Sequence, residues 1–176
     1  MSLTVRELWT VIHGMVLGAV FLLAFAGGLA GLWSLRPEWV TPEGVRERLR
    51  RLDWGTTILA LVAWLTVITG TYIVYPWYRA KPPEGVDLTM YPRSYLKANP
   101  NLVAWHSFGM EWKEHVAWLS PILATAVAFV VWRYGDRLVE SPKIRRALII
   151  LFTLSFVAAG VAGLMGAFLN KVAPVM

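Results

Sequence analysis

The segment from Trp105 to Trp118, WHSFGMEWKEHVAW, gathers most of the side chains in this chain that could bind a metal or move a proton. It contains two of the three histidines, His106 and His115, and the carboxylates Glu111 and Glu114. It then runs directly into an apolar stretch. Ligand-forming groups at the entry to an apolar helix are typical of functional sites in membrane proteins. We therefore expect the chemistry of the protein to be centred on this segment.

The third histidine, His13, stands in another apolar stretch, near the N-terminal end of the chain. Iron accepts imidazole in both of its common oxidation states, so a bis-histidine haem needs only one histidine from each of two facing helices. Because His13 and His115 are expected at matched depth on two helices, we predict that they ligate one haem b. Methionine ligation is the alternative that this pairing leaves open, and the candidates are Met15, Met110 and Met165.

His106 is predicted to lie at the rim of this site rather than on the same iron. It precedes His115 by nine residues, which would turn it to the opposite side of a continuous helix. We expect it to bind a quinone head group or a haem propionate. It could instead replace His115 as the ligand if Gly109 breaks the helix. Glu111 shares a face with His115 and is expected to fix its tautomer.

The chain contains no cysteine, which excludes several kinds of redox centre. Disulfides, thiolate metal sites, iron–sulfur clusters and covalently attached c-type haem all require cysteine. Any cofactor must therefore be held by histidine, methionine, carboxylate or backbone groups.

Small and basic residues near the same membrane face are expected to complete the cofactor site. Glycines at this level leave space for a flat cofactor, although glycines between helices equally serve close backbone contact. Basic side chains nearby could pair with haem propionates. The expected residues are Gly14, Gly18, Gly163 and Gly166 for space, and Arg6, Arg79 and Lys113 for the propionates.

The composition identifies an integral membrane protein. Hydrophobic residues make up 57% of the chain and charged residues only 16%, which is too apolar for a soluble domain of this length. The formal net charge is +6, but the basic residues lie between the apolar runs and not along a helix face. This pattern favours loops that face lipid head groups and implies no nucleic-acid partner.

Four apolar stretches are long enough to cross a hydrocarbon core of about 30 Å. We expect an all-α, integral membrane, four-helix up-down bundle forming a single membrane domain over residues 1–176. Residues 36–53 should form a polar loop, and the proline-containing segment 79–110 a long, irregular loop over the bundle. Pro121 should kink the third span. The expected spans are 8–33, 54–78, 111–133 and 144–170.

Arginine and lysine concentrate in two short connections, around residues 36–53 and 133–146. The positive-inside rule places these connections in the cytoplasm. We therefore expect a bacterial-type inner (cytoplasmic) membrane protein with both termini outside the cytoplasm. With four spans, all three histidines converge on one end of the bundle, whichever way the chain is inserted.

In architecture the chain resembles the four-helix membrane cytochromes b that anchor or serve respiratory enzymes. The resemblance rests on the four spans and on His13 with His106 or His115, and it covers the bundle. It implies an electron-transfer subunit without catalytic residues of its own, exchanging single electrons with quinone or with another subunit of a respiratory or photosynthetic complex. Members of this class with two haems carry two histidine pairs, whereas three histidines allow at most one bis-histidine haem.

Two alternatives remain open at the level of the sequence. The first is a non-haem copper or iron site with a redox or catalytic role. Its ligands would come from His13, His106, His115, Glu111 and Glu114. The second is a structural accessory subunit of a larger membrane complex, in which the histidines are merely interfacial.

The distribution of basic residues makes a prediction about topology. Reporter fusions at Arg50 and at Glu84 should report opposite compartments, with Arg50 in the cytoplasm. A cytoplasmic reporter at Glu84 would contradict the orientation and would move the histidine site to the other membrane face.

Overall fold

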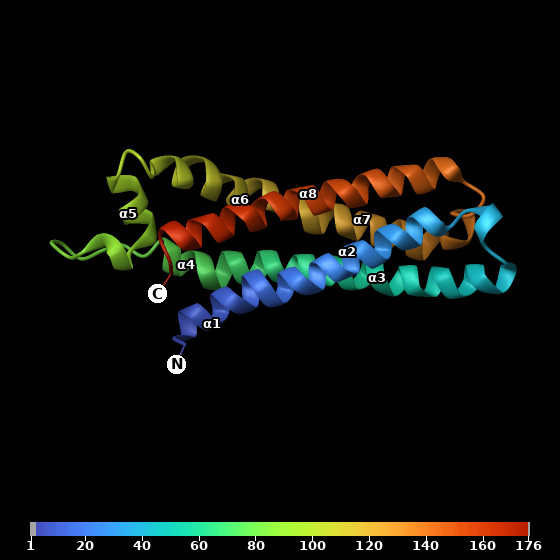
Figure 1. The fold of residues 1–176 in the computed structure, drawn as a ribbon, viewed down its shortest axis with the longest axis horizontal. Helices are drawn as coiled ribbons and strands as arrows, with labels where there is room; N and C mark the ends of the chain where they lie inside the picture. The colour runs from blue at the N-terminus through green and yellow to red at the C-terminus, as the bar shows by residue number, and fades with distance from the viewer. Residues whose placement is uncertain (1–2, 176) are drawn as a thin grey trace. The chain divides into compact units, whose positions relative to one another are not determined.

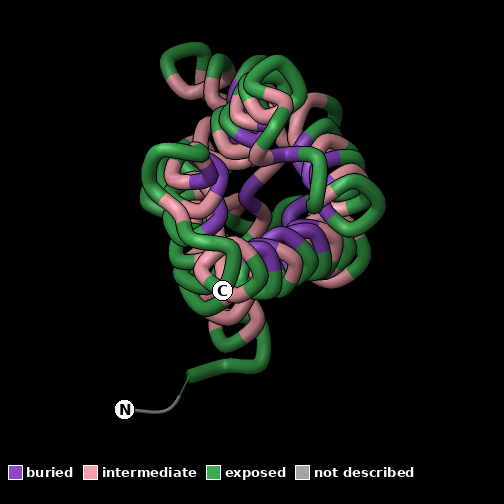
Figure 2. Tube along the Cα trace, turned by 90° about the vertical axis from the view of Figure 1, so that its right-hand side faces the viewer, coloured by how far each residue is buried: buried purple, intermediate pink, exposed green. Residues whose placement is uncertain are grey.

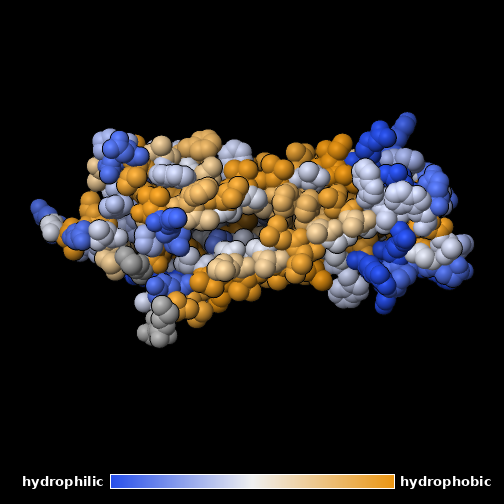
Figure 3. Space-filling view, in the orientation of Figure 1, coloured by the Kyte–Doolittle hydropathy of each residue, from blue (hydrophilic) through white to orange (hydrophobic). Residues whose placement is uncertain are grey.

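The structure, a computed structural model, describes residues 3–175, and most of them are helical (Figure 1). No strand occurs among these residues. Four helical stretches are long and apolar enough to cross a membrane, and many of their apolar side chains are exposed, as the hydrophobic surface in Figure 3 shows. The all-α, multi-pass fold is confirmed. The four stretches are Val5–Ser34, Pro42–Tyr78, Trp105–Arg137 and Pro142–Val172.

The chain divides into two compact units, and each unit contains a segment of all four membrane helices. Unit 1 combines the chain up to Gly18 with Leu65–Trp118 and the chain from Ala159 onward. Unit 2 combines Ala19–Trp64 with Leu119–Ala158. All three histidines therefore belong to unit 1.

Unit 2 is built from regular helices: α2 (Leu17–Ser34), α3 (Pro42–Thr69), α7 (Leu119–Tyr134) and the first half of α8 (Pro142–Val172). Buried residues line the inner sides of the helices (Figure 2). Phe25 of α2 stacks on Phe156 of α8 with ring centroids 4.2 Å apart. The hydroxyl of Ser155 donates to the Ser120 carbonyl at 2.9 Å, so this buried polar pair is satisfied internally.

The predicted polar loop 36–53 is wrong beyond its first residues, because α3 begins at Pro42. The Thr41 hydroxyl accepts a hydrogen bond from the Gly44 N–H at 3.1 Å and so caps the helix. Pro42 loses no helical hydrogen bond at the first position, and Glu43 is favourable at the positive end of the helix dipole. The basic run is therefore the solvated first part of a helix.

Unit 1 consists of shorter elements, three of them π-helical. It contains α1 (Val5–Val11), α4 (Tyr75–Tyr78), α5 (Pro92–Ala98) and α6 (Glu111–His115). The π-helical turns contain one glycine each and are Ile12–Val16, Gly70–Val74 and Trp105–Met110. Single π-helical turns inside longer helices are frequent at functional sites.

The expected irregular loop 79–110 contains α5 and the π-helical turn that starts at Trp105. Leu96 of α5 is fully buried in a cluster with Tyr78 and Met110. Tyr78 is thus a core residue. Asp87 caps the short 3₁₀ helix Leu88–Met90: the hydroxyl and the backbone N–H of Thr89 donate to its carboxylate and lower its pKa.

Non-α turns precede two prolines of the spans, while the kink predicted at Pro121 stays a prediction. Pro121 cannot donate to the Ala117 carbonyl, and the preceding residues Val116–Trp118 form a 3₁₀ turn. Pro76 likewise follows the π-helical turn Gly70–Val74.

Gly28 and Gly27 of α2 provide a matched test of the packing in unit 2. A Cβ added at Gly28 would lie 2.7 Å from Cζ of Phe152, whereas a Cβ at Gly27 would meet nothing within 4 Å among the described residues. Gly28→Ala should therefore lower the free energy of unfolding by about 1–3 kcal/mol. Gly27→Ala should leave it unchanged or raise it by up to about 1 kcal/mol. Thermal unfolding in detergent, followed by circular dichroism, measures both, and equal effects would contradict the described packing.

Candidate functional site in unit 1

His13 lies inside unit 1 with its Nδ1 3.1 Å from the hydroxyl oxygen of Thr69. The Thr69 hydroxyl donates its own proton to the Leu65 carbonyl at 2.7 Å. Its oxygen must therefore accept from His13, which places the imidazole proton on Nδ1. In the neutral ring this tautomer leaves the lone pair on Nε2. His13 is thus held in the form that a metal ligand or a hydrogen-bond acceptor requires.

Gly70 is the residue that allows the His13 ring to lie against the second span. A Cβ at this position would be 2.7 Å from Cε1 and 3.2 Å from Nε2 of His13. Real Cβ atoms essentially never approach another atom to 2.7 Å. A side chain at residue 70 would therefore displace the ring and its bond to Thr69.

Lys113 turns its ammonium group into the same interior. Its Nζ donates to the Ala162 carbonyl at 3.3 Å and lies 2.5 Å from where a Cβ of Gly166 would stand. The charge is close enough to His13 to act on it electrostatically. Within the described residues, no carboxylate lies within 4.0 Å of this ammonium. An intramembrane lysine with only a carbonyl partner is costly and marks a functional site by default.

Two neighbours of Lys113 carry buried polar atoms that have no hydrogen-bond partner in the described part of the chain. These are Nε1 of Trp112 and Oε1 of Glu114. Tyr75 lies beside Glu114 and interacts with its side chain. Buried polar atoms in native proteins are nearly always satisfied, so each of these atoms points to a water, ion or ligand.

His106 lies at a different level of unit 1. Its Nδ1 is 2.9 Å from the hydroxyl of Tyr78, with ring centroids 6.0 Å apart. Tyr78 follows Thr69 by nine residues, which corresponds to about 13 Å along a helix. His13 and His106 therefore contact the second span at well-separated depths.

The structure does not bring His115 to His13. The His115 side chain is 71% exposed, and its Nδ1 donates to the Glu111 carbonyl oxygen at 2.9 Å. Lys113 faces the interior, and a residue two positions further on a helix is turned by about 200°. His115 therefore points away from the interior. Its tautomer is set by the backbone of Glu111, whose carboxylate is further away at 3.5 Å.

The predicted glycines differ in their surroundings. Gly166 lies against Lys113, but a Cβ at Gly14, Gly18 or Gly163 would meet nothing within 4 Å in the described chain. Close backbone contact within the described chain therefore does not explain these three glycines. Gly14 and Gly163 are exposed, and only Gly18 is half-buried.

The other two predicted propionate partners lie over aromatic rings. The guanidinium of Arg6 is 6.0 Å from the Trp77 ring, and that of Arg79 is 5.3 Å from the Tyr75 ring. Across residues 3–175, no group of three or more histidine, aspartate or glutamate side chains is arranged to hold a metal ion.

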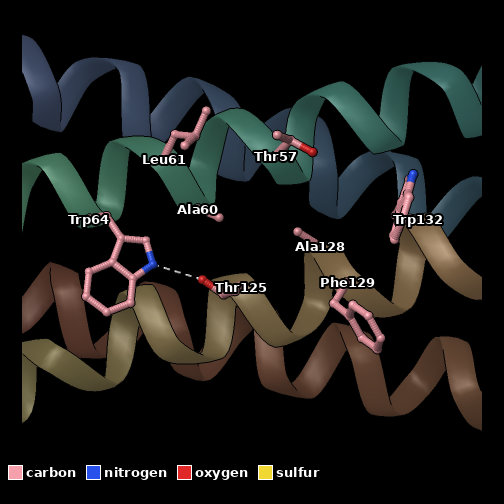
Figure 4. Close-up of a pocket in the computed structure, with 8 residues that line it drawn as sticks. All are labelled: Thr57, Ala60, Leu61, Trp64, Thr125, Ala128, Phe129 and Trp132. Carbon is pink, nitrogen blue, oxygen red and sulfur yellow. Dashed lines mark hydrogen bonds between the residues drawn. The ribbon is translucent and has the colours of Figure 1, made fainter.

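Unit 2 offers a contrast to this polar interior. A groove of about 410 Å³ runs between α3 and α7 (Figure 4). Its polar side chains include Trp64, whose indole nitrogen donates to Thr125 at 3.0 Å. No titratable side chain lines it. This groove therefore offers no side chain for acid–base chemistry or metal binding.

Sequence reasoning found the three histidines and Lys113 but missed Thr69 and Tyr78 as their partners. The glycines within the π-helical turns are the only local signal for this arrangement. No family model, curated protein or solved structure matches the chain. The function must therefore be argued from the geometry of the site.

Lys113 yields a prediction that separates a structural from a functional role. Lys113→Met keeps the length of the side chain and removes the buried charge, so it should raise the free energy of unfolding by about 1–3 kcal/mol. Lys171→Met, at an exposed position of the same unit, should change it by less than about 1 kcal/mol. Unfolding in mixed micelles measures both variants. A loss of stability in Lys113→Met would show that the ammonium is a structural element.

Proposed function

We propose that this protein is a membrane redox subunit whose unit 1 binds one haem b through His13. In this role it exchanges single electrons with quinone or with a partner subunit. The observation that carries the proposal is the hydrogen bond from His13 to Thr69, which leaves Nε2 as a ligand nitrogen inside an apolar protein. Haem supplies reversible one-electron exchange at its iron when it is bound.

The surrounding residues fit the needs of such a group. A haem requires an imidazole nitrogen, flat space and hydrogen-bond donors for its propionates. Nε1 of Trp112 and Nζ of Lys113 are donors without a carboxylate partner in the described residues. Gly18 is half-buried and has open space beside it, whereas Gly14 and Gly163 lie on the exposed outside of their helices. Thr69 and Gly70 would hold the imidazole in place.

The structure brings no second imidazole to His13, in contrast to the His13–His115 pair expected from depth. His115 would have to turn through about half a revolution of its helix to face His13. His106 contacts the second span at another level. In the described conformation His13 is therefore the single imidazole available to the iron, and we expect a high-spin haem.

Quinone binding without haem is the second candidate, because the interior holds a complementary pair of groups. Nε2 of His13 can accept a proton from a quinol hydroxyl, and Nζ of Lys113 can donate to a quinone carbonyl. This candidate needs no second histidine.

For the location we propose a bacterial-type inner membrane with both termini outside the cytoplasm. Support comes from the arginines that crowd the start of α3 and the start of α8.

The decisive experiment is the pyridine haemochrome spectrum of the purified protein and of its histidine variants. We expect one haem b per chain in the wild type and loss of most of it in His13→Ala. His106→Ala and His115→Ala should keep the haem. Thr69→Val should weaken haem binding by about tenfold, because outer-shell partners of ligand histidines typically contribute 10–100-fold.

Full haem content in His13→Ala would refute the ligand assignment. A low-spin wild type that becomes high-spin in His115→Ala would establish the His13–His115 pair and would show that α6 turns. If the wild type lacks haem but binds a short-chain quinone in a manner that Lys113→Met abolishes, the quinone candidate holds. If metal analysis and quinone titration are also negative, the protein is a structural accessory subunit.

A further inference from the structure

A second cavity lies in unit 2, at the end that carries the connections between spans. It has a volume of about 480 Å³ and is lined by residues from the end of α2, the following 3₁₀ turn Pro37–Trp39 and the start of α8. Hydrophilic residues gather at these connections (Figure 3). The haem proposal concerns unit 1 and makes no use of this cavity.

Arg36 is held in this cavity by two tryptophans. The centre of its guanidinium group is 4.7 Å from the ring of Trp33 and 4.7 Å from the ring of Trp39. Its Nε donates to the Trp33 carbonyl at 3.3 Å. Stacking on aromatic faces preorganises a guanidinium group and leaves its edge free for hydrogen bonds, which suits bidentate binding of a phosphate.

Two more arginines line the cavity from the first turns of α8. Nη1 of Arg145 donates to the Leu138 carbonyl at 3.0 Å, which fixes this side chain against the preceding turn. Arg146 is exposed. Glu38 is the one carboxylate in the lining, and none of the three arginines forms an ion pair within 4.0 Å among residues 3–175. With three arginines and one carboxylate, the lining therefore carries a net positive charge.

The remaining walls of the cavity are apolar and lead into the membrane helices. Ile149 and Pro142 of α8 face it together with the indole rings of Trp33 and Trp39. Tryptophan is enriched at the level of lipid head groups, and basic pockets between membrane helices on the cytoplasmic side bind anionic head groups. The combination matches an amphiphile with a phosphate group and apolar chains.

We propose that this cavity binds the phosphate group of an anionic phospholipid, with Arg36, Arg145 and Arg146 as its partners. The apolar walls favour a lipid over free phosphate as the source of that group. The arginines provide the attraction, and the two tryptophans fix Arg36 at the head-group level.

The test uses the delipidated full chain in detergent micelles and three probes: a phosphatidylglycerol, a phosphatidylcholine with the same acyl chains, and inorganic phosphate. Native mass spectrometry gives the occupancy of each lipid. The wild type should bind phosphatidylglycerol at least about tenfold more tightly than phosphatidylcholine, since each nearby basic residue contributes on the order of 1 kcal/mol to attraction of anionic lipid. Arg36→Gln/Arg145→Gln/Arg146→Gln should abolish this preference.

The matched control is Arg46→Gln/Arg50→Gln/Arg51→Gln, which removes the same charge from exposed positions outside the cavity. It should retain the preference within about threefold. Because Arg145 also holds the Leu138 carbonyl, Arg36→Gln/Arg146→Gln provides a second variant that spares this contact. An equal loss in the control, equal binding of both lipids by the wild type, or full displacement of phosphatidylglycerol by millimolar phosphate would each overturn the proposal.

Discussion

The requirement that backbone polar groups find partners inside the protein governs this structure. A membrane offers no water to unpaired N–H and C=O groups, so the spans must be helical. Hydroxyl groups within the helices also need hydrogen-bond partners, and they donate to backbone carbonyls of the preceding turn. Thr56 and Thr125 make such bonds in unit 2, and Thr69 makes one in unit 1. The Thr69 hydroxyl donates its proton to the Leu65 carbonyl, so its oxygen is left to accept a hydrogen bond from His13. The site chemistry thus follows from a constraint on the backbone.

The two units use the same four spans in different ways. In unit 2 the helices are regular, and aromatic stacking with small hydroxyl contacts fills the core. In unit 1 the π-helical turns displace the register of the helices, and His13 and His106 stand within two of these turns. Extra residues in a turn alter which side chains face inward. The regular unit can provide a stable frame, while the irregular unit positions polar side chains that a regular bundle would exclude.

Basic residues have different surroundings in the two units. Arg36 and the two arginines at the start of α8, Arg145 and Arg146, line a polar cavity in unit 2. Lys113 instead places its ammonium among Ala162 and Gly166 without a carboxylate nearby in the described residues. Desolvation makes the second arrangement costly. A ligand with acceptor oxygens would offset that cost, and this links the lysine to the proposed redox site.

The sequence by itself determined the features that depend on local composition. Apolar runs fixed the membrane class and four spans, because crossing the hydrocarbon requires about twenty apolar residues. Pro121 marked the place where the third span departs from regular α-helix, next to the 3₁₀ turn Val116–Trp118, and the concentration of ligand-forming residues identified the helical segment around Lys113. The start of α3 at Pro42 was missed, because solvated arginines hide a helix that continues beyond the membrane.

Only the tertiary structure decided which side chains contact the three histidines. The rotation of each helix depends on its π-helical turns and on packing against other spans, and neither can be read from spacing within one helix. His115 therefore matched His13 in expected depth and yet is exposed, while Thr69 and Tyr78 became the partners of the other two histidines.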